Sequence, residues 1–181
     1  IVGRSDLLRK ISFPKWIIVV SSTITALINF LINLCVIIVF ALLNGVTPSF
    51  TWLLAPLVIL ELYLLSLGIA FFLGSINVKY RDISSIWEVL MQALFYAVPI
   101  IYPITMVSAS SVLAAKVLLL NPIAQVIQDA RYLLITDQSI TVWNFIDNII
   151  LRFLPVLITL FILTIGSIYF RKHSKYFAEE A

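Results

Sequence analysis

Glu61 is the one acidic or basic side chain in an apolar run that extends from residue 52 to residue 74. An ionised carboxylate facing lipid costs several kcal/mol, so Glu61 must face the protein interior or water. It fits two roles: a structural hydrogen bond to Asn29, Asn33 or a missing span, which is favoured, and a place on a polar path through the membrane. Proton transfer is disfavoured because it would need a relay of His, Asp or Lys side chains.

Two further spacings indicate contacts between helices. Asn29 and Asn33 are four residues apart and so share one face of a predicted helix. Interhelical hydrogen bonds, worth about 1 kcal/mol each in membranes, and a polar stripe facing a channel explain this pair equally well. Ser66, Ala70 and Gly74 also recur every four residues, and this pattern predicts a ridge of small residues along which another helix packs.

The sequence has no residue set for catalysis or metal binding. It has one histidine, His173, in a basic tail, and one cysteine, Cys35, inside an apolar run. We expect a solvated His173 and a buried Cys35 thiol, with no disulfide within the chain. No G-x-x-x-x-G-K-[ST] loop is present to bind phosphates. We therefore expect no catalytic residue, no metal and no cofactor in this chain.

Four apolar runs must position these side chains: residues 16–43, 52–74, 87–104 and 149–170. A span needs about 20 apolar residues to cross about 30 Å of hydrocarbon, and only the third run is marginal. The composition agrees, with 62% hydrophobic and 12% charged residues and a mean hydropathy of +1.10. The sequence thus excludes a soluble domain and predicts an all-α integral membrane protein with four transmembrane helices.

Basic residues occupy alternate gaps between these runs: Arg4, Arg9, Lys10 and Lys15, then Lys79 and Arg81, and finally Arg171, Lys172 and Lys175 in the tail 171–181. By the positive-inside rule, both ends of the chain and the loop at 77–83 lie in the cytoplasm. Residues 44–51 and 105–148 then face outside. The net charge of +3 reflects these loops, and the scattered basic residues argue against nucleic-acid binding.

The segment 3–14 is predicted to form a short amphipathic helix at the cytoplasmic surface. Ser5 can cap it, Asp6 lies in its first turn, and Pro14 ends it. On the residues alone, an anchor among anionic headgroups is the favoured interpretation. On the residues alone, the loop at 77–83 is predicted to be an ordinary polar turn whose charges set the topology.

The outer segment 105–135 is predicted to be a re-entrant hairpin. Pro99 and Pro103 break the third helix, and the apolar stretch 108–120 is too short to cross. Asn121 can cap a following helix with Pro122 at its first position. Its apolar face would lie opposite an exposed polar face formed by Gln125, Gln128, Asp129 and Tyr132.

Three segments resemble the motifs of one family. Residues 7–14 read LLRKISFP, residues 79–83 read KYRDI, and residues 120–122 read LNP and precede an amphipathic run to Arg131. They look like the LIRKI-FP signature, the YRDI loop and the LNP…R segment of ABC-2 type transporter permeases, in the same order relative to the spans. The most similar branch exports polysaccharides such as O-antigen, capsule or teichoic acid. Its subunits have six spans, so the resemblance implies that two N-terminal spans are missing from residues 1–181.

The resemblance implies a permease subunit in the bacterial cytoplasmic membrane that pairs with a second copy and with cytoplasmic ABC ATPase subunits. ATP and Mg²⁺ would bind the ATPase, and the substrate would be a glycan. The segment 3–14 would be the coupling helix, and the loop at 77–83 would be a second contact with the ATPase. The implied coupling residues are Arg4, Leu8, Arg9, Lys10, Ile11, Phe13, Pro14, Tyr80, Arg81 and Asp82.

Aromatic residues near the outer segment, Tyr96, Tyr102, Tyr132 and Trp143, are either an interfacial belt or a surface for stacking sugar rings. The resulting substrate-path hypothesis contains Asn29, Asn33, Glu61, Tyr96, Tyr102 and Tyr132. An ABC-2 exporter of drugs or lipids is the alternative within the family. An integral-membrane enzyme acting on lipid-linked sugars is disfavoured by the few polar residues in the cytoplasmic loops. A secondary transporter is disfavoured because no internal repeat is evident.

Overall fold

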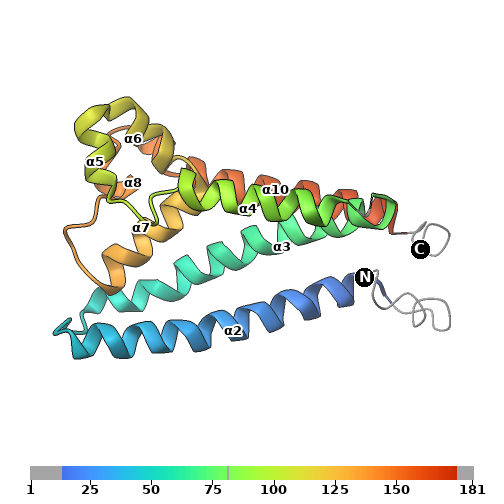
Figure 1. Ribbon diagram of the computed structural model, residues 1–181, viewed down its shortest axis with the longest axis horizontal. Coiled ribbons are helices and arrows are strands. Elements are labelled where there is room, and N and C mark those ends of the chain that lie inside the picture. The colour runs from blue at the N-terminus through green and yellow to red at the C-terminus, as the bar shows by residue number, and fades with distance from the viewer. Residues whose placement is uncertain (1–13, 81, 175–181) are drawn as a thin grey trace.

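The computed structural model describes residues 14–80 and 82–174, and every regular element in these ranges is a helix (Figure 1). Three long helices run alongside one another: α2 (Trp16–Leu43), α3 (Ala55–Lys79) and α10 (Leu154–His173). A fourth, α4 (Ile83–Ala97), lies along the same direction. A short 3-10 helix, Phe50–Leu54, precedes α3. The remaining helices form an outer layer at one end: α5 (Ile104–Ser110), α6 (Val112–Leu119), α7 (Pro122–Leu134), α8 (Val142–Phe145) and α9 (Ile149–Arg152).

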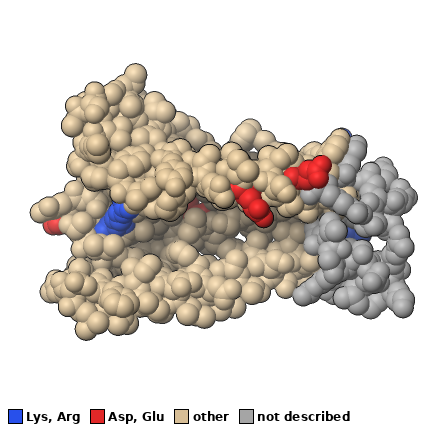
Figure 2. Space-filling model, in the orientation of Figure 1, with Lys and Arg blue, Asp and Glu red and all other residues tan. Residues whose placement is uncertain are grey.

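The described residues contain three helices long and apolar enough to span a membrane: Trp16–Leu43, Phe50–Val78 and Leu154–His173. The pair formed by α6 and α7, bent by 93°, would be a fourth if it were one broken span. Charged side chains are sparse on the face drawn in Figure 2. The prediction of an all-α integral membrane protein is therefore confirmed, and the count of four spans stays a prediction.

The third apolar run, expected to be helical over 87–104, differs from the expectation. Its helix α4 begins at Ile83 and ends at Ala97, and its 15 residues reach only about 22 Å. Val98, which precedes Pro99, has an extended backbone with ψ 145°. A residue before proline is pushed out of the helical region, and this explains why α4 ends where it does.

The tightest helix contact joins α3 and α10 through two glycines. A Cβ atom added to Gly68 would lie 2.6 Å from Leu163 Cα, and one added to Gly166 would collide with the Gly68 carbonyl oxygen. Helices in membranes gain their packing energy from such close approach of backbones. The ridge predicted at residues 66, 70 and 74 is therefore not where the closest approach occurs, and Ser66 is exposed.

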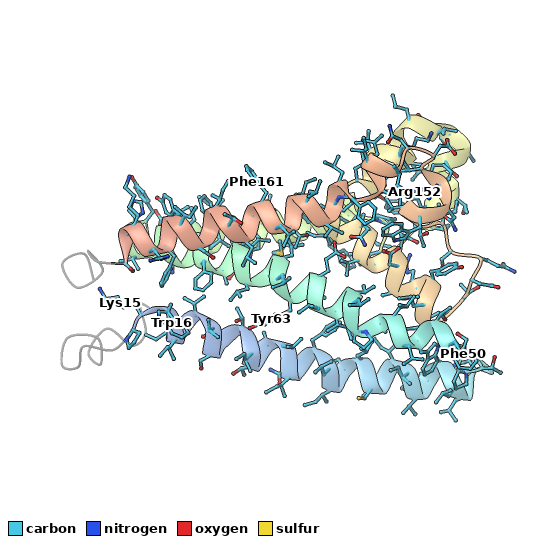
Figure 3. All side chains as sticks on the ribbon, turned by 180° about the vertical axis from the view of Figure 1, so that it is seen from behind. Lys15, Trp16, Phe50, Tyr63, Arg152 and Phe161 are labelled. Atoms are coloured by element: carbon cyan, nitrogen blue, oxygen red, sulfur yellow. The ribbon has the colours of Figure 1, made fainter. Side chains whose placement is uncertain are left out.

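Helix α2 packs less closely, with one packed contact near its start and a second in its C-terminal half. Val19 packs with Val78 and Phe170 at the first contact, and Leu34 packs beside Ala55 at the second. Figure 3 places Tyr63 in the region between these contacts, where a cavity of about 230 Å³ separates α2 from α3. Near the start of α2, Lys15 also donates to the Ser174 carbonyl, so the two described ends of the chain lie together.

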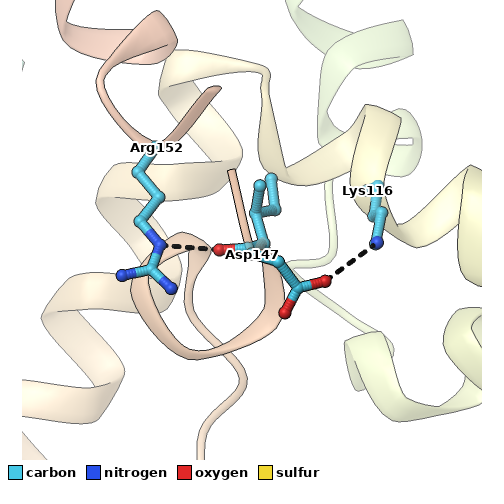
Figure 4. A network of polar contacts seen from close by, with 4 residues as sticks. Lys116, Asp147 and Arg152 are labelled. Carbon is cyan, nitrogen blue, oxygen red and sulfur yellow. Dashed lines mark hydrogen bonds and ion pairs between the residues drawn. The ribbon is translucent and has the colours of Figure 1, made fainter. Parts of the chain in front are cut away.

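The outer layer has its own small core, formed by Ile104, Ala115, Leu119, Val142 and Ile146. Polar contacts tie its segments together (Figure 4): Lys116 pairs with Asp147 at 3.8 Å, and Arg152 Nε donates to the Ile146 carbonyl at 2.6 Å. This layer covers the end of α3 and α10 and positions the side chains of α7.

Candidate functional site

A buried polar cluster joins α3 to α7. Gln125 Nε2 donates to Glu61 Oε2 at 3.3 Å and to Asp129 Oδ2 at 2.6 Å. Gln125 and Asp129 are four residues apart and therefore share one face of α7. One amide thus bridges two carboxylates, one from each helix.

The start of α7 follows the sequence expectation. The Asn121 side chain accepts a hydrogen bond from the Ile123 amide at 2.9 Å, and Pro122 is the first helical residue. This cap fixes where α7 begins, and it thereby fixes which residues face α3 one and two turns later.

Trp143 completes the cluster from α8. Its Nε1 donates to Asp129 Oδ2 at 3.2 Å, and its ring packs edge-on against Phe153. At the start of α8, the Asn144 side chain accepts a hydrogen bond from the Thr141 amide at 2.8 Å. The short helix is thus held locally, and its indole is aimed at α7.

The α7 side of the cluster is buried, and the cluster is only partly hydrogen-bonded. Gln125 is 2% exposed and Asp129 is 5% exposed. Three oxygens of the cluster have no hydrogen-bond partner among the described residues: Glu61 Oε1, Gln125 Oε1 and Asp129 Oδ1. The adjacent Gln128 Nε2 also has none. Buried polar atoms are nearly always paired in native proteins, so such a group calls for an explanation.

These side chains line a cleft of about 460 Å³ between α3, α7 and α8. Its walls combine the polar cluster with aromatic and aliphatic side chains. The lining residues are Leu54, Leu57, Val58, Glu61, Gln125, Asp129, Tyr132, Leu133, Thr141, Trp143 and Asn144. A mostly apolar cleft with a few convergent polar groups is the usual form of a binding site.

Arg131, on the same helix, holds the break after α4. Its guanidinium donates to the Pro99 carbonyl at 2.9 Å and to the Ile100 carbonyl at 2.7 Å. Because the backbone here is not helical, these carbonyls lack the usual helical partners, and the planar fork of an arginine matches two of them at once. The arginine of the LNP…R segment therefore positions α7 against the broken end of α4.

The structure brings together only two of the six proposed path residues, Glu61 and Tyr132, which line the same cleft. The predicted hydrogen bond from Asn29 or Asn33 to Glu61 is wrong, because Gln125 hydrogen-bonds to it. A further partner in a missing span stays a prediction. Asn33 instead donates to the backbone oxygen of Asn29 on the exposed surface of α2.

Two tyrosines of that hypothesis lie elsewhere. Tyr96 is exposed on α4 beside Phe95, and the Tyr102 hydroxyl donates to the Ala97 carbonyl at 3.0 Å. Of the coupling residues, only Pro14, Tyr80 and Asp82 lie within the described residues, and all three are exposed. The others, namely Arg4, Leu8, Arg9, Lys10, Ile11, Phe13 and Arg81, lie outside them.

Three further expectations are corrected. The polar face of α7 is buried against α3 rather than exposed, because it meets Glu61. Cys35 is exposed on α2 rather than buried, since α2 has few neighbours. His173 is not a freely solvated tail residue: its ring stacks on Tyr169 with centroids 4.1 Å apart. Among residues 14–80 and 82–174, no three His, Cys, Asp or Glu side chains are grouped to hold a metal ion.

Three curated relatives share the name O-antigen export system permease protein RfbA. The one from Myxococcus xanthus is 33% identical over 122 residues, which cover 67% of this chain and 46% of the relative. Two from Klebsiella pneumoniae are 26% identical over 134 residues and 28% identical over 184 residues. These matches cover 72% and 98% of this chain, and 49% and 65% of the relatives. No protein-family model matches the chain.

The apolar helices and the all-α fold define the class of protein, a multi-pass integral membrane protein. Within that class, the chain is a homologue of O-antigen export permeases, which confirms the recognition of an ABC-2 polysaccharide export permease from its motifs. The chain spans about half the length of the first two of these relatives.

Proposed function

We propose that this chain forms part of the membrane permease of an ATP-driven exporter that moves a polysaccharide or lipid-linked glycan out across the bacterial cytoplasmic membrane. The observation that carries this proposal is the similarity to O-antigen export permeases over most of the chain. The apolar helices provide the membrane-spanning part that such a permease requires.

The energy would come from a separate cytoplasmic ABC ATPase, with ATP and Mg²⁺ bound there, and the permease would work with a second copy of itself. The basic residues before the first apolar run and in the tail 171–181 favour a cytoplasmic location for both ends of the chain. The segment 3–14 and the loop at 77–83 would contact the ATPase, and Arg9 and Phe13 would be part of that contact.

Glu61 and Tyr132 are the path residues that the cleft supports, because both line it. Asn29, Asn33, Tyr96 and Tyr102 remain in the proposed path as residues on other faces. An assembled dimer would bring separate faces together, so their distance from the cleft in one chain does not remove them from the proposal.

A deletion tests the function in the native cells. We expect loss of the complete permease gene to abolish the polymer at the cell surface while the polymer accumulates inside, measured with the same glycan-specific label on intact and permeabilised cells. Inactivating the phosphate-binding lysine of the partner ATPase should give the same result. An undiminished surface polymer in the deletion strain would reject the proposal.

A lipid exporter is the second candidate, favoured by one specific observation. An apolar groove of about 490 Å³ lies between α3, α4 and α10, and Phe72, Trp87 and Phe161 are among its lining residues. A groove of this kind fits an acyl chain. If the deletion left the surface polymer intact but depleted a lipid from the outer leaflet, this candidate would replace the first.

A further inference from the structure

Side chains that line the cleft between α3, α7 and α8 carry buried hydrogen-bond acceptors that have no partner in the described part of the chain. Glu61 Oε1, Gln125 Oε1 and Asp129 Oδ1 have no partner among the described residues, and all three residues line the cleft. Gln125 and Asp129 are more than nine-tenths buried. An unpaired buried acceptor destabilises the protein, so a ligand that supplies hydrogen-bond donors would recover much of the lost energy.

The charge of the cleft restricts the ligand. Its lining contains two carboxylates and no lysine or arginine. The basic side chains nearby in the outer layer are engaged elsewhere: Arg131 with Pro99 and Ile100, Lys116 with Asp147, and Arg152 with Ile146. A ligand bearing phosphate or carboxylate groups would be repelled in a site of low dielectric constant, where like charges interact strongly.

The walls and size of the cleft favour a ligand larger than an ion. Trp143 and Tyr132 provide aromatic surface, and Leu57 provides aliphatic surface at the lining. The volume of about 460 Å³ falls within the range of roughly 300–1,000 Å³ typical of sites for small organic molecules. Hydroxyl groups donate strong hydrogen bonds to carboxylates, while the C–H faces of sugar rings lie well on aromatic side chains.

We propose that this cleft binds an uncharged sugar unit of the exported chain, that the side chains of Glu61, Gln125 and Asp129 turn toward it to accept hydrogen bonds from its hydroxyl groups, and that the two carboxylates select against anionic polymers. The inference rests on the proposed export of a glycan and narrows its substrate to a neutral polysaccharide. Teichoic acids and acidic capsules carry negative charge along the chain and would be excluded at this site.

Cysteine protection tests the site in cells that make the native polymer. The complete permease, with its ATPase, carries Cys35→Ser, and all other cysteines outside residues 1–181 are likewise replaced. Leu57→Cys then places a thiol at the cleft, where the leucine is 63% exposed. We expect N-ethylmaleimide to label this thiol several-fold more slowly when polymer synthesis is switched on than when it is off.

The matched control is Leu113→Cys, on α6 and outside the cleft, where the leucine is 74% exposed. Its labelling should not depend on polymer synthesis. Adding Glu61→Gln and Asp129→Asn, together or singly, should reduce the protection of Leu57→Cys because neutral acceptors bind hydroxyl groups less strongly. Unchanged labelling of Leu113→Cys and an unchanged amount of permease in the membrane show that each variant is folded.

A change of polymer tests the selection. In cells that synthesise an anionic glycan instead, Leu57→Cys should not be protected from N-ethylmaleimide in the unaltered cleft. Adding Glu61→Gln together with Asp129→Asn should introduce some protection of this thiol. Protection by the anionic glycan in the unaltered cleft would overturn the charge selection.

The other outcomes separate this inference from the proposed function. Normal export without any protection of Leu57→Cys would overturn the sugar site and leave the export function standing. Absence of export in the unaltered strain would reject the export function itself. Protection that needs Ca²⁺ or Mg²⁺, disappears with a chelator and occurs without polymer would show a cation site and would also overturn the inference.

Discussion

Helix α3 packs against two long apolar neighbours, α10 and α2, in two different ways. Against α10 it makes direct backbone contact at Gly68 and Gly166. Against α2 it meets packed side chains in two places and a cavity between them. Because lipid tails are as apolar as these side chains, burial alone does not hold helices together in a bilayer, and close packing decides which pair is firm. The α3–α10 pair is therefore the firm part of the protein, and α2 is its loosely attached part.

The exposed side chains support the same distinction. The most apolar stretch of α2 has no buried residue, whereas 22% of the corresponding stretch of α10 is buried. Polar side chains of α2, such as Ser22, Thr25 and Asn33, hydrogen-bond to the backbone of their own helix. These polar side chains of α2 thus find their hydrogen-bond partners within the helix, and its uncovered faces are available to lipid or to another subunit.

Enlarging the residue at the α3–α10 contact should have the largest effect. Gly166→Leu would force a side chain into the Gly68 backbone, which has no room to move aside. Overpacking usually costs about 1–3 kcal/mol, and a clash with backbone lies at or above the top of that range. We expect little folded permease in the membrane, measured by protease resistance and by gel filtration in detergent.

The matched change on the α2 side is Ser66→Leu, which faces the cavity of about 230 Å³ between α2 and α3. Since space is available there, the amount of folded protein should be unchanged or higher. Equal losses from Ser66→Leu and Gly166→Leu would show that the two contacts are equally tight and would remove the comparison.

Loss of the arginine clamp should have the second largest effect. Arg131→Gln would leave the Pro99 and Ile100 carbonyls without their donor, at a cost of about 1–3 kcal/mol. Because α7 packs beside α3 and α10, the loosened outer layer should lower the unfolding temperature in detergent. Arg152→Gln removes a donor from only one carbonyl, that of Ile146, so the decrease should be smaller. A larger decrease for Arg152→Gln would contradict the role of the clamp.

Shortening a side chain at the α2 contact should have a smaller effect. Val19 is buried against Val78 and Phe170, but in a membrane Val19→Ala loses only packing contacts. We expect a loss below about 1 kcal/mol in the free energy of unfolding in lipid, because this substitution leaves no polar group unpaired. An effect as large as that of Arg131→Gln would mean that α2 is held as firmly as α10.

Much of the fold could be predicted because it depends on local patterns. The run of apolar residues at 16–43 predicts the bounds of α2, and the sequence Asn121-Pro122 predicts the start of α7. Pro99 and Pro103 indicate the break after α4, although the helix ends earlier than the apolar run does. Local rules of this kind need no knowledge of which helices meet.

The polar site could be predicted only in part because it depends on which helices meet. Glu61 attracted attention as a charge within a span, but its partner Gln125 lies 64 positions further along the chain. The spacing of Gln125 and Asp129 placed them on one face, and general rules of amphipathicity assigned that face to water. A polar face can equally meet a buried carboxylate, and the spacing alone does not distinguish the two cases. Gly68 and Gly166 were missed for the same reason, since neither forms a repeat within its own helix.

The smallest effect on stability is expected on the exposed surface of α2, where it distinguishes lipid from a transport path. Asn33 donates only to its own helix, so Asn33→Leu should change the free energy of unfolding by less than about 0.5 kcal/mol. If Asn33 belongs to the proposed path, export of the glycan should nevertheless fall, because a polar group facing the passing chain is lost. Thr164→Val on α10 is the control, since its exposed hydroxyl also bonds only to its own helix, at the Leu160 carbonyl. Export that falls with Asn33→Leu but not with Thr164→Val would place the uncovered side of α2 on the path. Unchanged export in both would leave that side to lipid and remove Asn33 from the proposed path.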